Sequence, residues 1–190
     1  MERDVLWSPW SEPGFEHLHL AQHNDGIIAN GLIVLVEEDV LFRVGYSIYC
    51  DVQWRVQEVS LELLNKGSQG IRLLADGEGH WRTASGESMP SLDGCLDVDI
   101  SATPFTNTLP IRRLGLAVGA SSELTVTYIK VPEMQIRPER QRYTCLDTNP
   151  EGGLYRYEGL STGFMAELRV DRDGLVIDYP GLFRRIWPGR

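Results

Sequence analysis

The stretch that decides the fold runs from Phe42 to Val56 and reads FRVGYSIYCDVQWRV. Nearly all its even-numbered positions are apolar and most odd-numbered positions are polar, which is the period of a β-strand with one buried face. Such a strand would be long, because globular strands usually have about five or six residues. From 59 to 63 the apolar positions become odd-numbered. We therefore predict one long strand with a β-bulge near 57–58, a feature that bends a sheet.

The same alternation recurs later in the chain, at 124–128, 141–145 and 164–170. Acidic residues followed by glycine, at 76–79 and 171–174, supply the positive φ that tight hairpin turns need. These patterns predict a mostly β fold with a long, curved antiparallel sheet that forms an incomplete, or half, barrel.

Three other segments complete the predicted fold. Glu37-Glu38-Asp39 is expected to turn the chain before the long strand, and residues 1–14 are expected to be irregular, with Trp7 and Trp10 on the sheet. A single short helix is predicted at 108–114, where Asn107 or Thr108 would cap it, a proline lies in the first turn and two arginines lie near the end.

The length of 190 residues fits one domain, 1–190, whose two halves share a faint likeness. The chain has 18 basic and 27 acidic residues, a net charge of −9, so it lacks the clustered cations of a nucleic-acid-binding protein. The longest near-apolar run, 26–36, is too short to span a bilayer, so no transmembrane segment is expected.

The cysteines and the N-terminus together predict a cytoplasmic protein. Cys50, Cys95 and Cys145 are odd in number and widely spaced, with no CxxC pair. The first seven residues, MERDVLW, have no apolar signal-peptide region. Free thiols are typical of the reducing cytosol.

No motif in the sequence indicates a cofactor or a metal. GxGxxG after a strand, a Walker loop, HExxH and GxSxG are all absent. His17 and His19 would share a strand face, but solvated polar positions explain them better than a metal site. We expect neither a cofactor nor a metal.

Two carboxylates and one thiol are the candidates for chemistry. Asp97 and Asp99 would lie on one strand face, and paired carboxylates can perform acid–base catalysis. A small-molecule hydrolase would use this pair, with Arg113 stabilising developing negative charge. The alternative is that the carboxylates form structural salt bridges. Cys95 is interpreted as a small buried residue rather than a nucleophile.

Aromatic residues interleaved with arginines favour a binding surface instead. Aromatic faces contact sugars and lipid chains, and arginine forks contact polar head groups. Taken singly, each aromatic residue is explained by the core of the sheet. The set is Trp54, Trp81, Tyr143, Tyr155 and Tyr157, interleaved with Arg55, Arg82, Arg142 and Arg156.

The segment 105–114, FTNTLPIRRL, resembles the signature of the “putative glycolipid-binding” family of bacterial proteins. Segments around it agree in order: 45–55, 92–100, 141–143 and 171–180. The resemblance covers nearly the whole chain and shows no clear departure from the family's pattern. It implies a curved antiparallel sheet like the incomplete barrel of bacterial lipoprotein carriers, and a glycolipid or related amphiphile as the ligand.

The sequence thus predicts a non-enzymatic binder of an amphipathic small molecule. A further hypothesis is that the chain forms homodimers through exposed strand edges. The apolar part of the ligand would lie on the concave face, in contact with Trp54, Trp81, Tyr143 and Tyr155. A polar or anionic head would meet Arg112, Arg113, Asn107 and Asp97.

Overall fold

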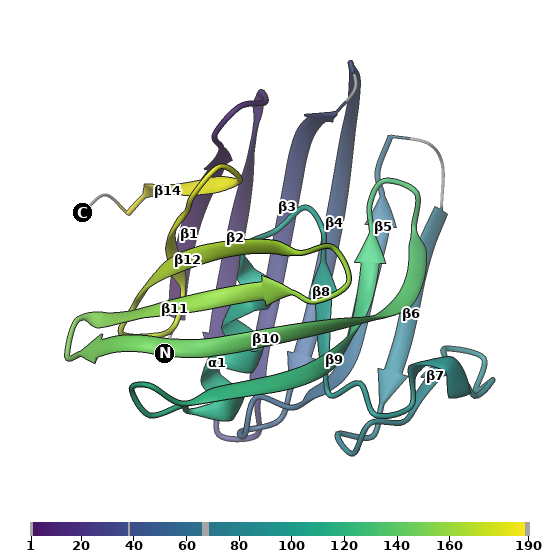
Figure 1. The fold of residues 1–190 in the computed structure, drawn as a ribbon. Coiled ribbons are helices and arrows are strands. Elements are labelled where there is room, and N and C mark those ends of the chain that lie inside the picture. Colours follow the sequence, from purple (N-terminus) through teal and green to yellow (C-terminus); the bar gives the residue numbers. More distant parts are fainter. Residues whose placement is uncertain (1, 38, 66–68, 189–190) are drawn as a thin grey trace.

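A computed structural model describes residues 2–37, 39–65 and 69–188 (Figure 1). The described residues form one sheet of 14 strands that is curved and does not close into a barrel. The predicted fold class, a mostly β chain with one long curved antiparallel sheet and one short helix, is confirmed.

The strands follow one another across the sheet almost in chain order. The order is β7-β6-β5-β4-β3-β2-β1-β14-β13-β12-β11-β10-β9-β8, so β7 and β8 are the edges. All pairs are antiparallel except β8 and β9, which run parallel. The strands are β1 (Glu2–Pro9), β2 (Gly14–Gln22), β3 (Ile27–Glu37), β4 (Val40–Cys50), β5 (Val56–Leu63), β6 (Gln69–Ala75), β7 (Trp81–Thr83), β8 (Asp97–Ile100), β9 (Ser121–Lys130), β10 (Gln135–Asn149), β11 (Gly152–Gly159), β12 (Phe164–Asp171), β13 (Val176–Tyr179) and β14 (Phe183–Trp187).

The sheet folds over itself into two layers. Figure 1 shows β9–β12 crossing in front of β1–β6, with the helix α1 (Thr108–Leu114) behind the front layer. Leu109 of α1 packs in the core of the rear layer, and Ile111 packs in the core of the front layer. Apolar faces of both layers are therefore buried on either side of α1, as alternating strands require.

The prediction of one long strand from Phe42 to Val56 is wrong for the second half of that segment. β4 ends at Cys50, the chain turns, and β5 returns antiparallel beside β4. The Asp51 carboxylate accepts hydrogen bonds from the backbone N–H groups of Gln53 and Arg55, both 2.9 Å. Trp54 takes a left-handed conformation, φ +65°. The predicted β-bulge is confirmed, because Tyr49 pairs with Glu58 and Cys50 pairs with Val56, which leaves Gln57 as the extra residue. This bulge in β5 reverses the phase of the buried positions after 56.

The N-terminal segment, expected to be irregular, contains a strand. β1 pairs with β2 on one side and with β14 on the other, and so joins the first and last parts of the chain. Trp7 is buried and donates from its indole Nε1 to the Val176 carbonyl at 2.7 Å, while Trp10 is 47% exposed.

The predicted hairpin turns and the short helix are confirmed. Turns separate β6 from β7 and β12 from β13, and Gly77 and Gly174 have φ of +75° and +80°. Gly115 follows α1 with φ +52°. The predicted N-cap is wrong, because a 3-10 turn, η2 (Phe105–Asn107), leads directly into α1 and no side chain caps it.

The turn expected at Glu37-Glu38-Asp39 lies partly outside the described residues, at Glu38. A second 3-10 turn, η1 (Pro90–Leu92), lies between β7 and β8. Near it the indole Nε1 of Trp81 donates to the Cys95 carbonyl at 2.7 Å, and the backbone N–H of Gly94 donates to the Gly79 carbonyl at 2.9 Å. These bonds hold the two edges of the sheet near each other without strand pairing.

Candidate ligand-binding groove

A groove with two compartments runs along the segment 99–107, which follows β8. The first compartment has a volume of about 230 Å³ and the second about 350 Å³. Ser101, Tyr128, Leu182 and Phe183 line both compartments, so the two compartments lie side by side. The larger compartment alone falls within the range of about 300–1,000 Å³ that is typical of small-molecule sites.

The first compartment is aromatic and polar. Tyr157 on β11, Phe164 on β12 and Tyr179 on β13 come from the front layer, and their ring centroids are 6.1–6.2 Å apart. Opposite them lie Asn107 and Thr103 of the segment after β8. We call this the polar compartment.

Three charged side chains line the polar compartment, and they lie on β8 and β10. Asp99 accepts hydrogen bonds from Gln141 Nε2 at 2.6 Å and Thr106 Oγ1 at 3.0 Å. Arg137 donates to the Glu139 carboxylate, and its guanidinium lies 4.5 Å from the ring centroid of Tyr128. Burial raises the pKa of Asp99, although both hydrogen bonds oppose the rise.

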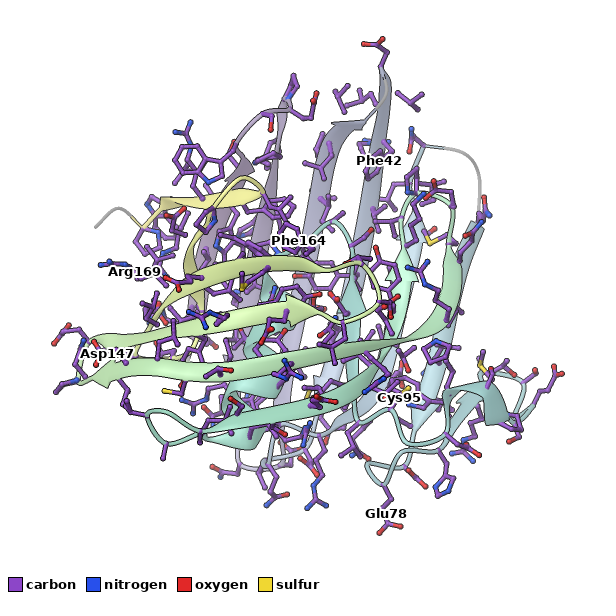
Figure 2. All side chains as sticks on the ribbon, viewed as in Figure 1. Phe42, Glu78, Cys95, Asp147, Phe164 and Arg169 are labelled. Atoms are coloured by element: carbon purple, nitrogen blue, oxygen red, sulfur yellow. The ribbon has the colours of Figure 1, made fainter. Side chains whose placement is uncertain are left out.

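The second compartment, which we call the apolar compartment, lies between the rear layer and the segment 101–102. It is lined mainly by aliphatic and aromatic side chains, together with the polar or charged residues Ser11, Glu12, Ser101, Tyr128 and Lys130. Figure 2 shows Phe42 on the rear layer and Phe164 on the front layer, one from each compartment. The apolar lining side chains are Pro9, Leu35, Val36, Phe42, Ala102, Val131, Leu182 and Phe183.

A buried carboxyl group supports the wall of the groove. Thr103, which lines the polar compartment, donates from Oγ1 to Glu16 Oε1 at 2.7 Å, and the Tyr46 hydroxyl donates to the same oxygen at 2.5 Å. Glu16 is 1% exposed and its Oε2 has no partner among the described residues. Burial raises the pKa of Glu16 to about 8.

The structure brings six of the eight predicted site residues together as three pairs. Arg113 forms a two-pronged ion pair with Asp97, whose side chain is fully buried; the shortest N–O distance is 2.6 Å. The Tyr143 hydroxyl donates to Asn107 Oδ1 at 2.8 Å.

The third pair joins Arg112 to Trp54, with the guanidinium 5.2 Å from the ring centroid. Of all eight residues, Asn107 alone lines the groove. Trp54 and Trp81 are 4% and 2% exposed and belong to the core. A binding role for these two, or for Asp97, Arg113 and Tyr143, stays a prediction.

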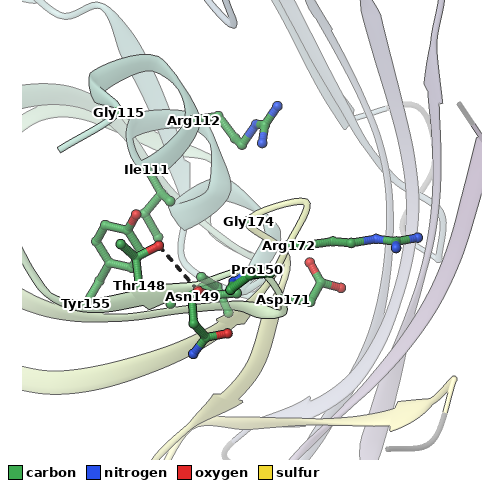
Figure 3. Close-up of a pocket in the computed structure, with 13 residues that line it drawn as sticks. Ile111, Arg112, Gly115, Thr148, Asn149, Pro150, Tyr155, Asp171, Arg172 and Gly174 are labelled. Atoms are coloured by element: carbon green, nitrogen blue, oxygen red, sulfur yellow. Dashed lines mark hydrogen bonds between the residues drawn. The ribbon is translucent and has the colours of Figure 1, made fainter. Parts of the chain in front are cut away.

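Arg112 and Tyr155 line a separate hollow of about 230 Å³ beside the β10–β11 and β12–β13 turns (Figure 3). Thr148 donates there to the Gly152 carbonyl at 3.4 Å. Figure 3 shows the guanidinium of Arg112 pointing away from Tyr155 and Thr148. The residues around this hollow therefore do not converge on one point.

The arrangement gives no support to the hydrolase alternative. An acid–base pair needs both carboxylates beside the substrate. Asp99 lines the polar compartment, but Asp97 is held by Arg113 outside it, and neither Asp97 nor Arg113 lines the groove. In the described part of the chain, no group of three or more His, Cys, Asp and Glu side chains is placed to hold a metal ion. The three cysteines are free and buried.

Several groove residues escaped the sequence prediction. Tyr128, Tyr157 and Tyr179 lie on three different strands, and only the folding of the sheet brings them to one cavity. Tyr157 lies two residues after Tyr155 and belongs to the interleaved aromatic set, which is the one local signal that pointed to it. Arg137 and Glu139 had no signal in the sequence.

The chain is similar to known proteins in sequence and in fold. The family described as “putative glycolipid-binding” matches residues 4–185. A crystal structure at 1.80 Å of a DUF1089 family protein from Pseudomonas aeruginosa is similar, with 40% sequence identity and a TM-score of 0.81; the match covers 90% of this chain and 92% of that one. No curated protein matches. None of the described helices has the length and apolar character needed to cross a membrane.

Proposed function

Because the chain belongs to the “putative glycolipid-binding” family, we propose that it binds an amphipathic small molecule, such as a glycolipid, in the two-compartment groove. The alkyl part lies in the apolar compartment against Leu35, Phe42 and Val131. The polar head lies in the polar compartment beside Asn107 and Asp99.

The adjacency of the two compartments, which share four lining residues, is the observation that carries this proposal. A head group needs hydrogen-bond partners, and an alkyl chain needs apolar surface removed from water at about 25 cal/mol per Å². The groove offers both kinds of lining in neighbouring compartments that share Tyr128 and Phe183. A site with only one kind of lining would bind only one half of an amphiphile well.

The proposal is tested by titrating the protein with decyl glucoside, below its micelle-forming concentration, in a calorimeter. Leu182 lines both compartments and is 40% exposed, so a charge placed there enters the groove without disrupting the core. Leu182→Asp should weaken binding by at least about tenfold, equivalent to ~1.4 kcal/mol.

The matched control is Ile186→Asp, since Ile186 is 49% exposed on β14 and lines neither compartment. It should bind decyl glucoside like the wild type. Equal loss of affinity in both variants would place the ligand elsewhere, and absence of binding to the wild type would refute the proposed function.

A further inference from the structure

The charged groups that line the polar compartment carry a net negative charge. They are Asp99, Glu139 and Arg137. Arg137 is committed to Glu139, because its Nε and Nη2 atoms donate to the same oxygen, Oε2, at 3.2 and 3.1 Å. The pair is neutral as a whole, so the charge of Asp99 has no matching cation in the lining.

The contacts of Asp99 agree with this balance. Both its oxygens accept hydrogen bonds from uncharged donors, the amide of Gln141 and the hydroxyl of Thr106. No ion pair to Asp99 occurs among the described residues. The pKa of Asp99 is raised chiefly by burial, and the nearby negative charge of Glu139 adds to the rise. A cation placed in the cavity would reverse this destabilisation of the carboxylate.

Glu139 contributes a second unsatisfied acceptor. Its Oε1 is buried and has no hydrogen-bond partner within the described ranges, while Oε2 is occupied by Arg137. The Glu139 side chain is 11% exposed. A buried acceptor without a donor is unfavourable, and a ligand N–H or O–H would satisfy it.

The aromatic walls favour the same sign of charge. The ring of Tyr128 already carries one cation, the Arg137 guanidinium, at 4.5 Å. Across the compartment, Tyr157, Phe164 and Tyr179 form a mutually packed set of rings. The faces of such rings attract cations and repel anions. Burial raises the pKa of the Tyr157 hydroxyl, and the nearby negative charges of Asp99 and Glu139 raise it further.

We infer that the polar head of the ligand carries a positively charged nitrogen with N–H donors, as in an amino sugar or an alkylamine. The ammonium lies between the carboxylates of Asp99 and Glu139 and against the tyrosine rings. Phosphate, sulfate and carboxylate heads are disfavoured. This inference rests on the proposed function and specifies the chemical class of its ligand.

The test compares three amphiphiles that share one alkyl chain: decylammonium, decyl glucoside and decyl sulfate, each titrated below its micelle-forming concentration. Decylammonium should bind at least about tenfold more tightly than decyl glucoside, and decyl sulfate should bind most weakly. Higher salt should weaken the binding of decylammonium more than that of decyl glucoside.

Two variants test whether the preference for the ammonium head arises at Asp99 and Glu139. Asp99→Asn and Glu139→Gln each remove one negative charge with little change of shape, and each should lower the ammonium-to-glucoside affinity ratio by about tenfold. Glu167→Gln is the matched control: Glu167 is on β12, has a side chain 50% exposed, and lies outside the groove. It changes the net charge equally and should leave the ratio unaltered.

Each outcome decides between the two proposals. Equal affinity for decylammonium and decyl glucoside, or tightest binding of decyl sulfate, overturns the inference and leaves the proposed function standing. A wild-type preference that survives in both groove variants also overturns it, because the cation then binds elsewhere. If the wild type binds none of the three amphiphiles, the inference and the proposed function fail together.

Discussion

Replacing Glu16 by glutamine should remove a large part of the pH dependence of stability. Glu16 Oε1 accepts hydrogen bonds from Tyr46 and Thr103, and burial raises its pKa from 4.5 to about 8. The folded protein therefore keeps the Glu16 proton up to about pH 8, whereas the unfolded chain releases it near pH 4.5.

The sign follows from proton linkage. Between these two values the folded state holds more protons than the unfolded state, so raising the pH lowers the free energy of unfolding. Each pH unit costs about 1.4 kcal/mol, hence about 3 kcal/mol between pH 5 and 7. The contribution of Glu16 to the free energy of unfolding is fully present below the pKa of Glu16 in the unfolded chain. It is lost as the pH rises through the pKa of Glu16 in the folded protein.

Urea denaturation of the wild type and Glu16→Gln at pH 5, 6, 7 and 8 measures this directly. Other titrating groups cancel in the difference between the two proteins. At pH 5 the variant should be slightly less stable, since its amide N–H groups lack acceptors where Oε2 stood. At pH 7 it should have gained about 3 kcal/mol relative to the wild type. A difference that stays constant across this range would refute the reasoning.

Two further substitutions test the packing. Arg113→Ala should lower the free energy of unfolding by about 3–5 kcal/mol, because it leaves the buried Asp97 charge uncompensated; urea denaturation checks this, and a loss below 1 kcal/mol would contradict it. Gly31→Ala should lower the melting temperature, because its Cβ would lie 2.0 Å from a ring carbon of Tyr46. Gly45→Ala, where the nearest atom is 3.8 Å away, should leave it nearly unchanged.

Elements set by local chemistry were predictable from the sequence. The turns at 76–79 and 171–174 contain acidic residues and glycines, and the Asp76 and Asp171 carboxylates accept backbone hydrogen bonds there. The helix at 108–114 was predicted with its observed bounds. Each of these structures depends on residues that are close in sequence.

Features that depend on distant partners were not predictable. β1 pairs with β2 and, along its other edge, with β14, which lies some 180 residues later in the chain. The alternation of apolar and polar positions continues past Cys50 to Trp54, although these residues form a turn. A turn residue can bury its side chain as a strand residue does, so the alternation did not reveal the turn. Asn107 does not cap the helix, because its side chain bonds to Tyr143 and to the Pro104 carbonyl.

The candidate site shows the same division. Asp97 stood out as one of two carboxylates on a strand face, and Arg112 and Arg113 as cations that follow it closely. Charge in sequence does not reveal whether such a group faces a cavity or a partner. The groove is lined by residues of β8, β10, β11 and β13, which lie between positions 99 and 183, and by residues of the rear layer. Sequence spacing carries no signal for such a meeting point.

A crystal structure of the protein with decyl glucoside bound tests the central claim most directly. We expect the decyl chain to lie against Leu35, Phe42 and Val131 in the apolar compartment, and the sugar to lie beside Asp99 and Asn107 in the polar compartment. A sugar bound instead in the hollow beside Arg112 and Tyr155, or on the outer face of the sheet, would contradict it.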